Sequence, residues 1–309
     1  MKKLLLSSLL ASTLIFTGCF KDDDTPIIIE EITIIQNGDG TGGTSIVVDV
    51  TGAITESTTW TSDKIYKLNQ KVVVDAGATL TIQEGTIIKG TPGTGSLASA
   101  LIVARGAKIN AVGTPSKPIV FTSSSDNIEI GQTEGTNLDE NDRGLWGGLI
   151  ILGNAPCSFS GDILEAQIEG IPADDTFGLY GGTDPADNSG VLSYISIRHG
   201  GALIGEGNEI NGLTLGGVGN GTIINNIEVV ANVDDGIEFF GGTVNASNLL
   251  VWAQGDDALD IDQAYSGTID NAVVVLGDFS DHAFEIDGPE GTATGSFTLQ
   301  NATIIGNMV

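Results

Sequence analysis

Acidic residues recur at fixed places in three segments near the C-terminus. Asp235–Phe239, Asp257–Ile261 and His282–Ile286 align without gaps, 22 and 25 residues apart. Carboxylate oxygens are hard ligands, and at this density they suit Ca²⁺ better than zinc, for which the sequence offers no Cys/His cluster. The candidate ligands are eight acids in and beside these three segments: Asp235, Glu238, Asp256, Asp257, Asp260, Asp262, Glu285 and Asp287.

Little positive charge lies near these acids in the sequence. The last basic residue is Arg198, so residues 199–309 contain no Lys or Arg and 16 Asp or Glu. Stacked carboxylates repel by about 1 kcal/mol in bulk water and by several times that at a partly buried surface. Without a cationic side chain, the repulsion is relieved by raised pKa values, by solvent counter-ions or by bound Ca²⁺. A solvated acidic face whose Asp and Asn residues make turns is the alternative interpretation.

The same region also has the residue types of a glycoside hydrolase. The segments Asn232–Asp235, Gln254–Asp257 and Ser280–Ala283 resemble the catalytic series of polygalacturonases. The resemblance implies that Asp235 and Asp257 bracket a water while Asp256 is the general acid that His282 orients. The sequence departs from the family at the residues that flank these positions, and the downstream basic pair that holds a sugar carboxylate is missing. We therefore keep catalysis as the alternative to binding.

Strand-length repeats must position these acids. Apolar and polar residues alternate over four to six residues between turn residues, which is a strand period. Alternation turns Ile237, Leu259 and Phe284 inward with Phe239, Ile261 and Ile286, and turns Glu238, Asp260 and Glu285 outward. A second repeat aligns Gly221–Ile223 with Gly242–Val244 and Gly267–Ile269.

Repeats of this length without helical segments predict an all-β fold, a right-handed parallel β-helix over residues 53–309. Composition agrees, because 44 glycines and 6% aromatic residues accompany 40% hydrophobic residues. At about 23 residues per coil we expect on the order of eleven coils and a rod about 50 Å long. A β-sandwich is the competing fold. Asn301–Val309 ends on a strand without a polar cap, so we expect the β-helix to be truncated at its C-terminus.

The N-terminus has the features of an export signal. Basic residues precede the uncharged, mostly apolar run Leu4–Phe16, which is too short to span a bilayer, so residues 1–18 are expected to be a signal peptide. Phe16–Cys19 resembles a bacterial lipobox, which implies lipidation of Cys19. The charged segment Phe20–Asp24 resembles the signal that directs lipoproteins of Bacteroidota to the cell surface.

Residues 19–52 are then expected to be the lipidated cysteine and an acidic tether. As an alternative, the apolar segments Ile27–Ile29 and Ile46–Val48 contribute a first strand. Cys157 is the cysteine that remains after lipidation, and we expect a partly buried thiol. The net charge of -28 argues against a nucleic-acid partner.

Several long motifs, in order along the chain, resemble a family of Bacteroidota surface lipoproteins that share a β-helix of undetermined function. That resemblance implies an outer-membrane, lipid-anchored, surface-exposed protein. We expect a binding or adhesion module for extracellular glycan or protein, assisted by Ca²⁺; a polysaccharide-degrading enzyme and a structural stalk are the alternatives. The motifs are Leu80–Gly90, Ala100–Gly106, Arg143–Asn154, Gly178–Gly190, Ile197–Gly201, Glu209–Gly217 and Asp234–Val244.

Overall fold

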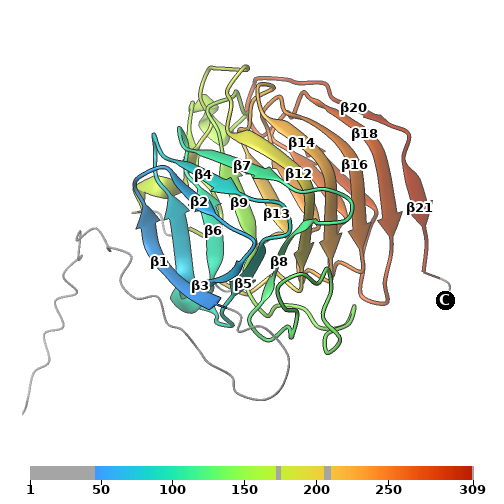
Figure 1. Cartoon of the computed structure of the whole chain (residues 1–309). Helices are drawn as coiled ribbons and strands as arrows, with labels where there is room; N and C mark the ends of the chain where they lie inside the picture. Colours follow the sequence, from blue (N-terminus) through green and yellow to red (C-terminus); the bar gives the residue numbers. More distant parts are fainter. Residues whose placement is uncertain (1–45, 172–174, 205–209, 308–309) are drawn as a thin grey trace, which may run out of the picture.

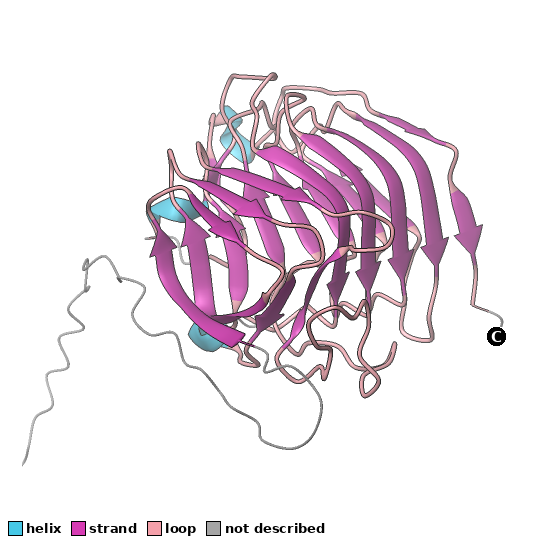
Figure 2. Cartoon of the chain, in the orientation of Figure 1, coloured by secondary structure: helices cyan, strands magenta, loops and turns pink. Residues whose placement is uncertain are grey.

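The short strands of the chain wind into a parallel β-helix. The computed structural model describes residues 46–171, 175–204 and 210–307. Each coil contributes to three parallel sheets that surround one apolar interior, and the successive coils stack along the axis (Figure 1). Strands dominate, with only short helical turns between them (Figure 2). The predicted all-β class and the parallel β-helix are confirmed.

Sheet 1 is the sheet that contains the acidic segments. Its neighbouring strands are parallel and pair in one continuous series. In spatial order they are the second half of β1 (Ile46–Ile54), the second half of β3 (Lys64–Val74), β6 (Ala100–Val103), β9 (Leu149–Leu152), β13 (Leu213–Gly216), β15 (Ile237–Phe240), β17 (Leu259–Asp262) and β19 (Phe284–Gly288).

Sheets 2 and 3 share four strands of eight or nine residues, which bend around a corner of the coil. Sheet 2 comprises the first halves of β1 and β3, β5 (Ile87–Gly90), β8 (Ile119–Ser123), the second halves of β12 (Gly190–Arg198), β14 (Ile223–Val230), β16 (Asn245–Trp252) and β18 (Thr268–Val275), and β21 (Thr303–Ile305). Sheet 3 comprises β2 (Thr58–Trp60), β4 (Thr79–Ile82), β7 (Lys108–Val112), the first halves of those four strands, and β20 (Thr298–Gln300).

Asparagine explains the corner between sheets 3 and 2. Asn226, Asn248 and Asn271 have φ of 53°, 56° and 62° in the middle of β14, β16 and β18. Asn tolerates this left-handed conformation better than most residues. The side chains also stack, because Asn271 Nδ2 donates to Asn248 Oδ1 at 2.6 Å. In these three successive coils one residue type at one place thus turns the chain while the ladder continues on both sides, and Tyr194 takes the same conformation, with φ 53°, at the equivalent place in β12.

Two long segments leave the coil and pack on its outside. The first excursion, residues 124–148, joins β8 to β9, and the second excursion, residues 153–189, joins β9 to β12. The second excursion buries its own apolar side chains on the outer face of sheet 1. It contains η2 (Ser160–Asp162), η3 (Thr176–Gly178) and the antiparallel pair β10 (Ala166–Gln167) and β11 (Leu179–Tyr180); η1 (Gly95–Leu97) lies between β5 and β6.

The structure differs from the sequence prediction in the number of coils and in where the first coil begins. Eight strands follow one another in sheet 1, so the described part has about eight coils and a length of about 35 Å at 4.8 Å per coil, not eleven and 50 Å. The excess residues lie outside the stack. The coil also begins before residue 53, because β1 starts at Ile46, so Ile46–Val48 form the first strand and the expected tether ends earlier. Ile27–Ile29 lie outside the described residues.

The strand register confirms one predicted repeat and corrects the other. Glu238 pairs with Asp260 and Asp260 with Glu285, as the aligned acidic segments require. The glycine-threonine alignment is wrong by one or two positions, because Ile224 pairs with Ala246 and Ala246 with Ile269. Burial of the inward side chains sets this register, whereas the length of the turn before each strand varies. Ile286 keeps its predicted pairing but is 54% exposed at the last coil of sheet 1.

Candidate functional site

The outer face of sheet 1 changes from apolar to acidic along the axis. One row of paired residues runs across the sheet, one residue per coil, on the side away from the interior. Its first members pack against the second excursion, and its last three are carboxylates. We call this row the acid row: Val73, Ile102, Ile150, Thr214, Glu238, Asp260 and Glu285. The predicted stack of three outward acids is therefore present.

A second row lies at the corner that precedes sheet 1, and we call it the corner row. In three successive coils a side-chain oxygen accepts a hydrogen bond from the main-chain N–H one coil later. Asn211 Oδ1 accepts from Asp235 N at 3.2 Å, Asp235 Oδ1 from Asp257 N at 3.0 Å, and Asp257 Oδ1 from His282 N at 2.8 Å. These hydrogen bonds hold the start of each strand to the preceding coil.

The acid row and the corner row meet in a carboxylate cluster. Asp235, Glu238 and Asp260 are each at least nine-tenths buried, and each offers an oxygen within 4.8 Å of the other two. Asn211 Nδ2 donates to Glu238 Oε2, and Glu238 is hydrogen-bonded to Asp260. Asp260 Oδ1 is buried and accepts no hydrogen bond from the described residues. A buried carboxylate oxygen without a donor is costly, so a positive partner at this oxygen would stabilise the cluster.

The pKa values of the cluster record the same lack of positive charge. Burial, followed by repulsion from Asp234, raises the pKa of Asp235 to about 9. Burial, followed by the charge of Glu169, raises the pKa of Glu238 well above its ordinary value. Burial also raises the pKa of Asp260. At neutral pH Asp235 therefore holds a proton unless a cation takes the proton's place, and the pKa values of Glu238 and Asp260 are shifted in the same direction.

The residues of the cluster fit a hard divalent cation. Three carboxyl groups converge, and one of their oxygens has no hydrogen-bond donor among the described residues. Oxygen-only donor sets are what Ca²⁺ takes in proteins. No ion pair to Lys or Arg is present at these three acids among the described residues. Asp235, Glu238 and Asp260 are thus the side chains that would hold the ion.

The other predicted ligands lie around the cluster but outside it. Asp256 is exposed and groups with Asp234 and Asp235. Asp257 is buried, where it accepts from His282 and is hydrogen-bonded to Glu285. The remaining acids continue the acidic surface toward the last coil. Burial is the main cause that raises the pKa of Asp262 to about 7. The hydrogen bond to Asp257 is the main cause that raises the pKa of Glu285 to about 7, and the exposed Asp287 completes this set.

The residues that resemble the catalytic series of polygalacturonases have structural roles in this protein. Asp235 and Asp257 belong to the corner row, and each has an oxygen engaged by a main-chain N–H. The imidazole of His282 contacts Asp257 through Nδ1 at 2.9 Å, whereas the resemblance requires it to orient Asp256. The corner row explains this similarity, because a turn that recurs in each coil selects Asp, Asn or His whether or not chemistry takes place.

Tertiary structure does bring positive charge toward residues 199–309, contrary to the expectation from the sequence. Arg143, from the first excursion, lies with its guanidinium carbon 4.6 Å from the ring centre of Phe279. Arg198 pairs with Glu228 at 3.2 Å. Neither arginine forms an ion pair with the carboxylate cluster. The negative charge of the carboxylate cluster is therefore not compensated by either arginine, although other parts of residues 199–309 do contact positive side chains.

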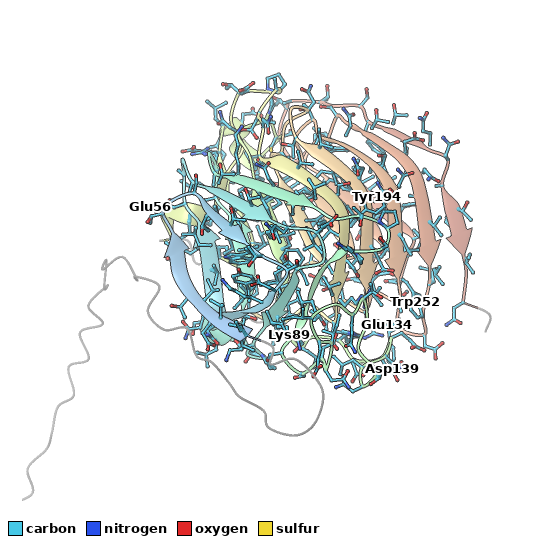
Figure 3. All side chains as sticks on the ribbon, viewed as in Figure 1. Glu56, Lys89, Glu134, Asp139, Tyr194 and Trp252 are labelled. Atoms are coloured by element: carbon cyan, nitrogen blue, oxygen red, sulfur yellow. The ribbon has the colours of Figure 1, made fainter. Side chains whose placement is uncertain are left out.

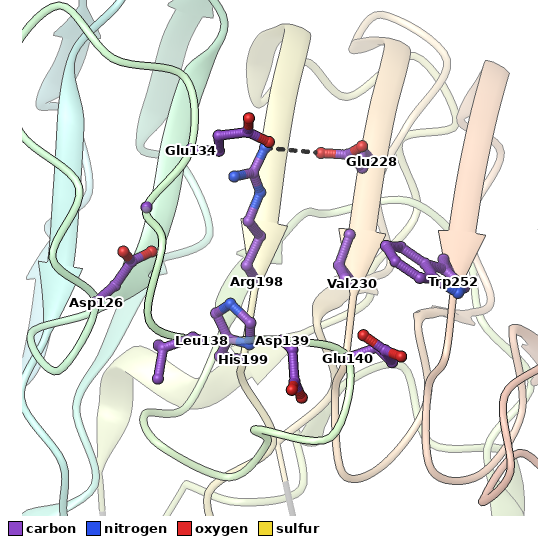
Figure 4. Close-up of a pocket in the computed structure, with 11 residues that line it drawn as sticks. Asp126, Glu134, Leu138, Asp139, Glu140, Arg198, His199, Glu228, Val230 and Trp252 are labelled. Atoms are coloured by element: carbon purple, nitrogen blue, oxygen red, sulfur yellow. Dashed lines mark hydrogen bonds and ion pairs between the residues drawn. The ribbon is translucent and has the colours of Figure 1, made fainter.

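A cleft of about 310 Å³ lies elsewhere, between the first excursion and the outer face of sheet 2. Arg198, Val230 and Trp252 form its floor on adjacent strands, and the first excursion contributes the opposite wall (Figure 4). Figure 3 places Glu134, Asp139 and Trp252 on the same side of the molecule. No pattern in the sequence predicted this cleft, since the residues of its two walls are 58 to 126 positions apart in the chain.

Arg198–His199 ends β12 in a turn, with His199 at φ 62°, directly before two glycines. Cys157 is half-buried as expected and is a free thiol; burial raises its pKa to about 12. Within the described residues no helix is both long and apolar enough to span a membrane. Cys19 lies outside them.

Comparison with known proteins adds one finding. The family model of the pectate-lyase-like beta helix domain matches residues 52–309. No curated protein and no solved structure gives a significant match to the chain. The matched residues contain every strand except the beginning of β1, and they include both the carboxylate cluster and the cleft.

Proposed function

Because the chain belongs to the pectate-lyase-like β-helix family, we propose that it is a binding module for extracellular glycan or protein, held at the cell surface by a lipid and assisted by Ca²⁺. The family fits a polysaccharide-related role, so glycans are the first ligands to test. In this proposal the β-helix is a rigid support, and its acidic end contributes a cation site rather than a catalytic one.

The carboxylate cluster is the observation that carries the proposal. Glu238 and Asp260 are buried side by side in one row, and the exposed fraction of Asp260 is 9% although no donor in the described part of the chain reaches its Oδ1. Replacing water around a charge with a protein interior is favourable only when an opposite charge or donors compensate. Ca²⁺ would supply that compensation and join two successive coils.

Binding is favoured over hydrolysis by the surroundings of the acids. An inverting hydrolase needs two carboxyl groups that face a sugar and a water from opposite sides. Asp235 and Asp257 are 7% and 1% exposed, and both hold main-chain N–H groups of the next coil. This arrangement suits a structural row better than a general acid and base.

A calcium titration tests the proposed function. We expect calorimetry to show one main site per chain with a dissociation constant of about 10⁻⁴ M, as in other extracellular calcium modules. The double substitution Glu238→Gln with Asp260→Asn keeps shape and removes both charges, so it should abolish the heat of binding. Exposed acids outside the cluster give the matched control, Glu56→Gln with Asp278→Asn. Equal calcium binding by both double variants would contradict the assignment.

The lipid anchor is a separate part of the proposal and has its own test. The signal-like segment and Cys19 support it. We expect the Cys19→Ser variant to leave the membrane fraction and to lose labelling by a radioactive fatty acid, because acyl chains contribute about 0.8 kcal/mol per buried methylene. Protease added to intact cells should cleave the wild-type protein if it faces outward. Membrane retention of Cys19→Ser would refute the anchor.

A further inference from the structure

We propose that the cleft between the first excursion and sheet 2 binds an amino sugar, a glycan unit that carries a protonated amine. This rests on the proposed function and names the ligand class of one site. The cleft lies on sheet 2, away from the acid row of sheet 1, and neither the family match nor the calcium site assigns any role to it.

The floor of the cleft offers an apolar platform. Arg198 pairs with Val230 and Val230 with Trp252 on successive strands, so the three side chains are spaced about 5 Å apart. Trp252 is 40% exposed, which is unusual for an indole on the face of a sheet. The apolar face of a sugar ring can stack on such an indole while its polar groups reach the surrounding acceptors.

The charge of the lining excludes acidic sugars. One guanidinium lines the cleft together with five carboxylates: Asp126, Glu134, Asp139, Glu140 and Glu228. The guanidinium is already engaged, because Arg198 donates through Nε to Ser196 at 2.7 Å, through Nη1 to the Thr133 oxygen at 3.0 Å and through Nη2 to Glu228 at 3.2 Å. A uronate would meet repulsion without a free cation, whereas an ammonium group would be attracted.

The unengaged acids and the indole match an ammonium group in particular. Glu134 and Glu140 are exposed and make no ion pair or side-chain hydrogen bond within the described part of the chain, so their carboxylates are available to a ligand. Trp252 adds the attraction of its ring for a cation. Lys89, which could otherwise neutralise this wall, does not line the cleft and donates to the main-chain oxygen of Asp126 at 2.8 Å.

A buried histidine supplies one more acceptor. His199 is 5% exposed and lines the cleft, and its Nδ1 lies 2.6 Å from the main-chain oxygen of Asp142. A carbonyl oxygen only accepts, so Nδ1 carries the hydrogen and donates to it, and burial lowers the pKa of His199, which favours the neutral ring. Nε2 is then an acceptor. Around Trp252 the hydrogen-bond acceptors come from both walls of the cleft, as Figure 4 shows. This distribution suits the hydroxyl and amino groups of a sugar ring better than a single narrow side chain of a peptide ligand.

Titration with defined oligosaccharides tests the inference. We expect the glucosamine tetramer to bind at about pH 6, where its amines are protonated, and the N-acetylglucosamine tetramer to bind at least about tenfold more weakly because acetylation removes the charge. A galacturonate oligomer should not bind. Affinity should fall as NaCl is raised. A lysine-rich peptide is included to distinguish a protein ligand from a glycan.

Two substitutions locate the site. Trp252→Ala and Glu140→Gln should each weaken tetramer binding by about tenfold, and Trp252→Phe should recover part of the loss. Glu56→Gln, on an exposed acid that Figure 3 shows at the opposite end of the molecule, should bind as the wild type does. Circular dichroism of each variant verifies that the β-helix is intact.

Other results would overturn the inference. Equal affinity for the acetylated tetramer, preference for galacturonate, or binding that survives both Trp252→Ala and Glu140→Gln would each show that the cleft does not select an amino sugar. Tighter, Trp252-dependent binding of the peptide would assign the cleft to protein. If amino sugars fail while another glycan binds, the inference alone is wrong; if no glycan or protein binds at all, the proposed function fails with it.

Discussion

Saturating Ca²⁺ is expected to raise the melting temperature of the protein by about 5 to 10 °C. At a free concentration of about one hundred times the dissociation constant, binding to the folded state contributes about 2.7 kcal/mol. For a chain of this size 1 kcal/mol corresponds to roughly 2 to 4 °C. The effect should be large because the ion would offset the repulsion among Asp235, Glu238 and Asp260 and would join adjacent coils.

Differential scanning calorimetry with EDTA or CaCl₂ measures this shift. The variant Glu238→Gln with Asp260→Asn should melt at the same temperature in both buffers. Without metal it should be at least as stable as the wild type, because it removes two buried acids whose pKa values are raised. MgCl₂ at equal concentration is the control for ionic strength, and its smaller ion prefers a stricter geometry. A melting temperature that EDTA leaves unchanged from its value in CaCl₂ would rule out the calcium site.

The metal-free protein is expected to lose stability as pH rises from about 6 to 8.5, by about 3 kcal/mol. The folded state raises the pKa of Asp235 from 3.8 to about 9, so the folded protein holds a proton that the unfolded chain has released. A raised carboxyl pKa stabilises the fold at low pH, and this contribution disappears as pH approaches 9. Asp262 adds to the loss in the same direction near pH 7.

Denaturant unfolding in EDTA at several pH values checks this sign. Asp235→Asn is the matched variant, because Asn211 already occupies the equivalent place in the preceding coil and its oxygen accepts the same kind of N–H bond. It should flatten the pH dependence while leaving the fold intact. CaCl₂ should do the same in the wild type, since the ion takes the place of the protons. Stability that increases between pH 6 and 8.5 in EDTA would show that Asp235 is ionised in the metal-free fold.

The fold followed from local pattern. Strand alternation and gap-free repeats predicted the register of Glu238, Asp260 and Glu285, because stacking identical coils places equivalent residues one above another. The number of coils did not follow, since a residue count cannot distinguish a coil from an excursion. The glycine-threonine repeat misled for a related reason: turns vary in length, while the buried face that sets the register does not.

The cluster was only partly predictable. The sequence identified Asp235, Glu238 and Asp260 among eight candidate ligands, but their equal spacing could not say which would be buried together. Asn211 was missed, although its place before Gly212 matches Asp235 before Gly236. The same positions resembled a catalytic series, and the hydrogen bonds of the corner row explain that likeness without catalysis.

What the sequence by itself determined is the parallel β-helix, with its rows of equivalent residues and its excess of acids, because each depends on interactions between neighbouring coils. Tertiary structure alone decided where the two excursions lie, and with them the burial of Glu238, the reach of Arg143 to Phe279 and the cleft that contains Trp252 and Glu140. Excursions carry no repeat, and their positions depend on long-range apolar packing and charge, which no spacing along the chain records.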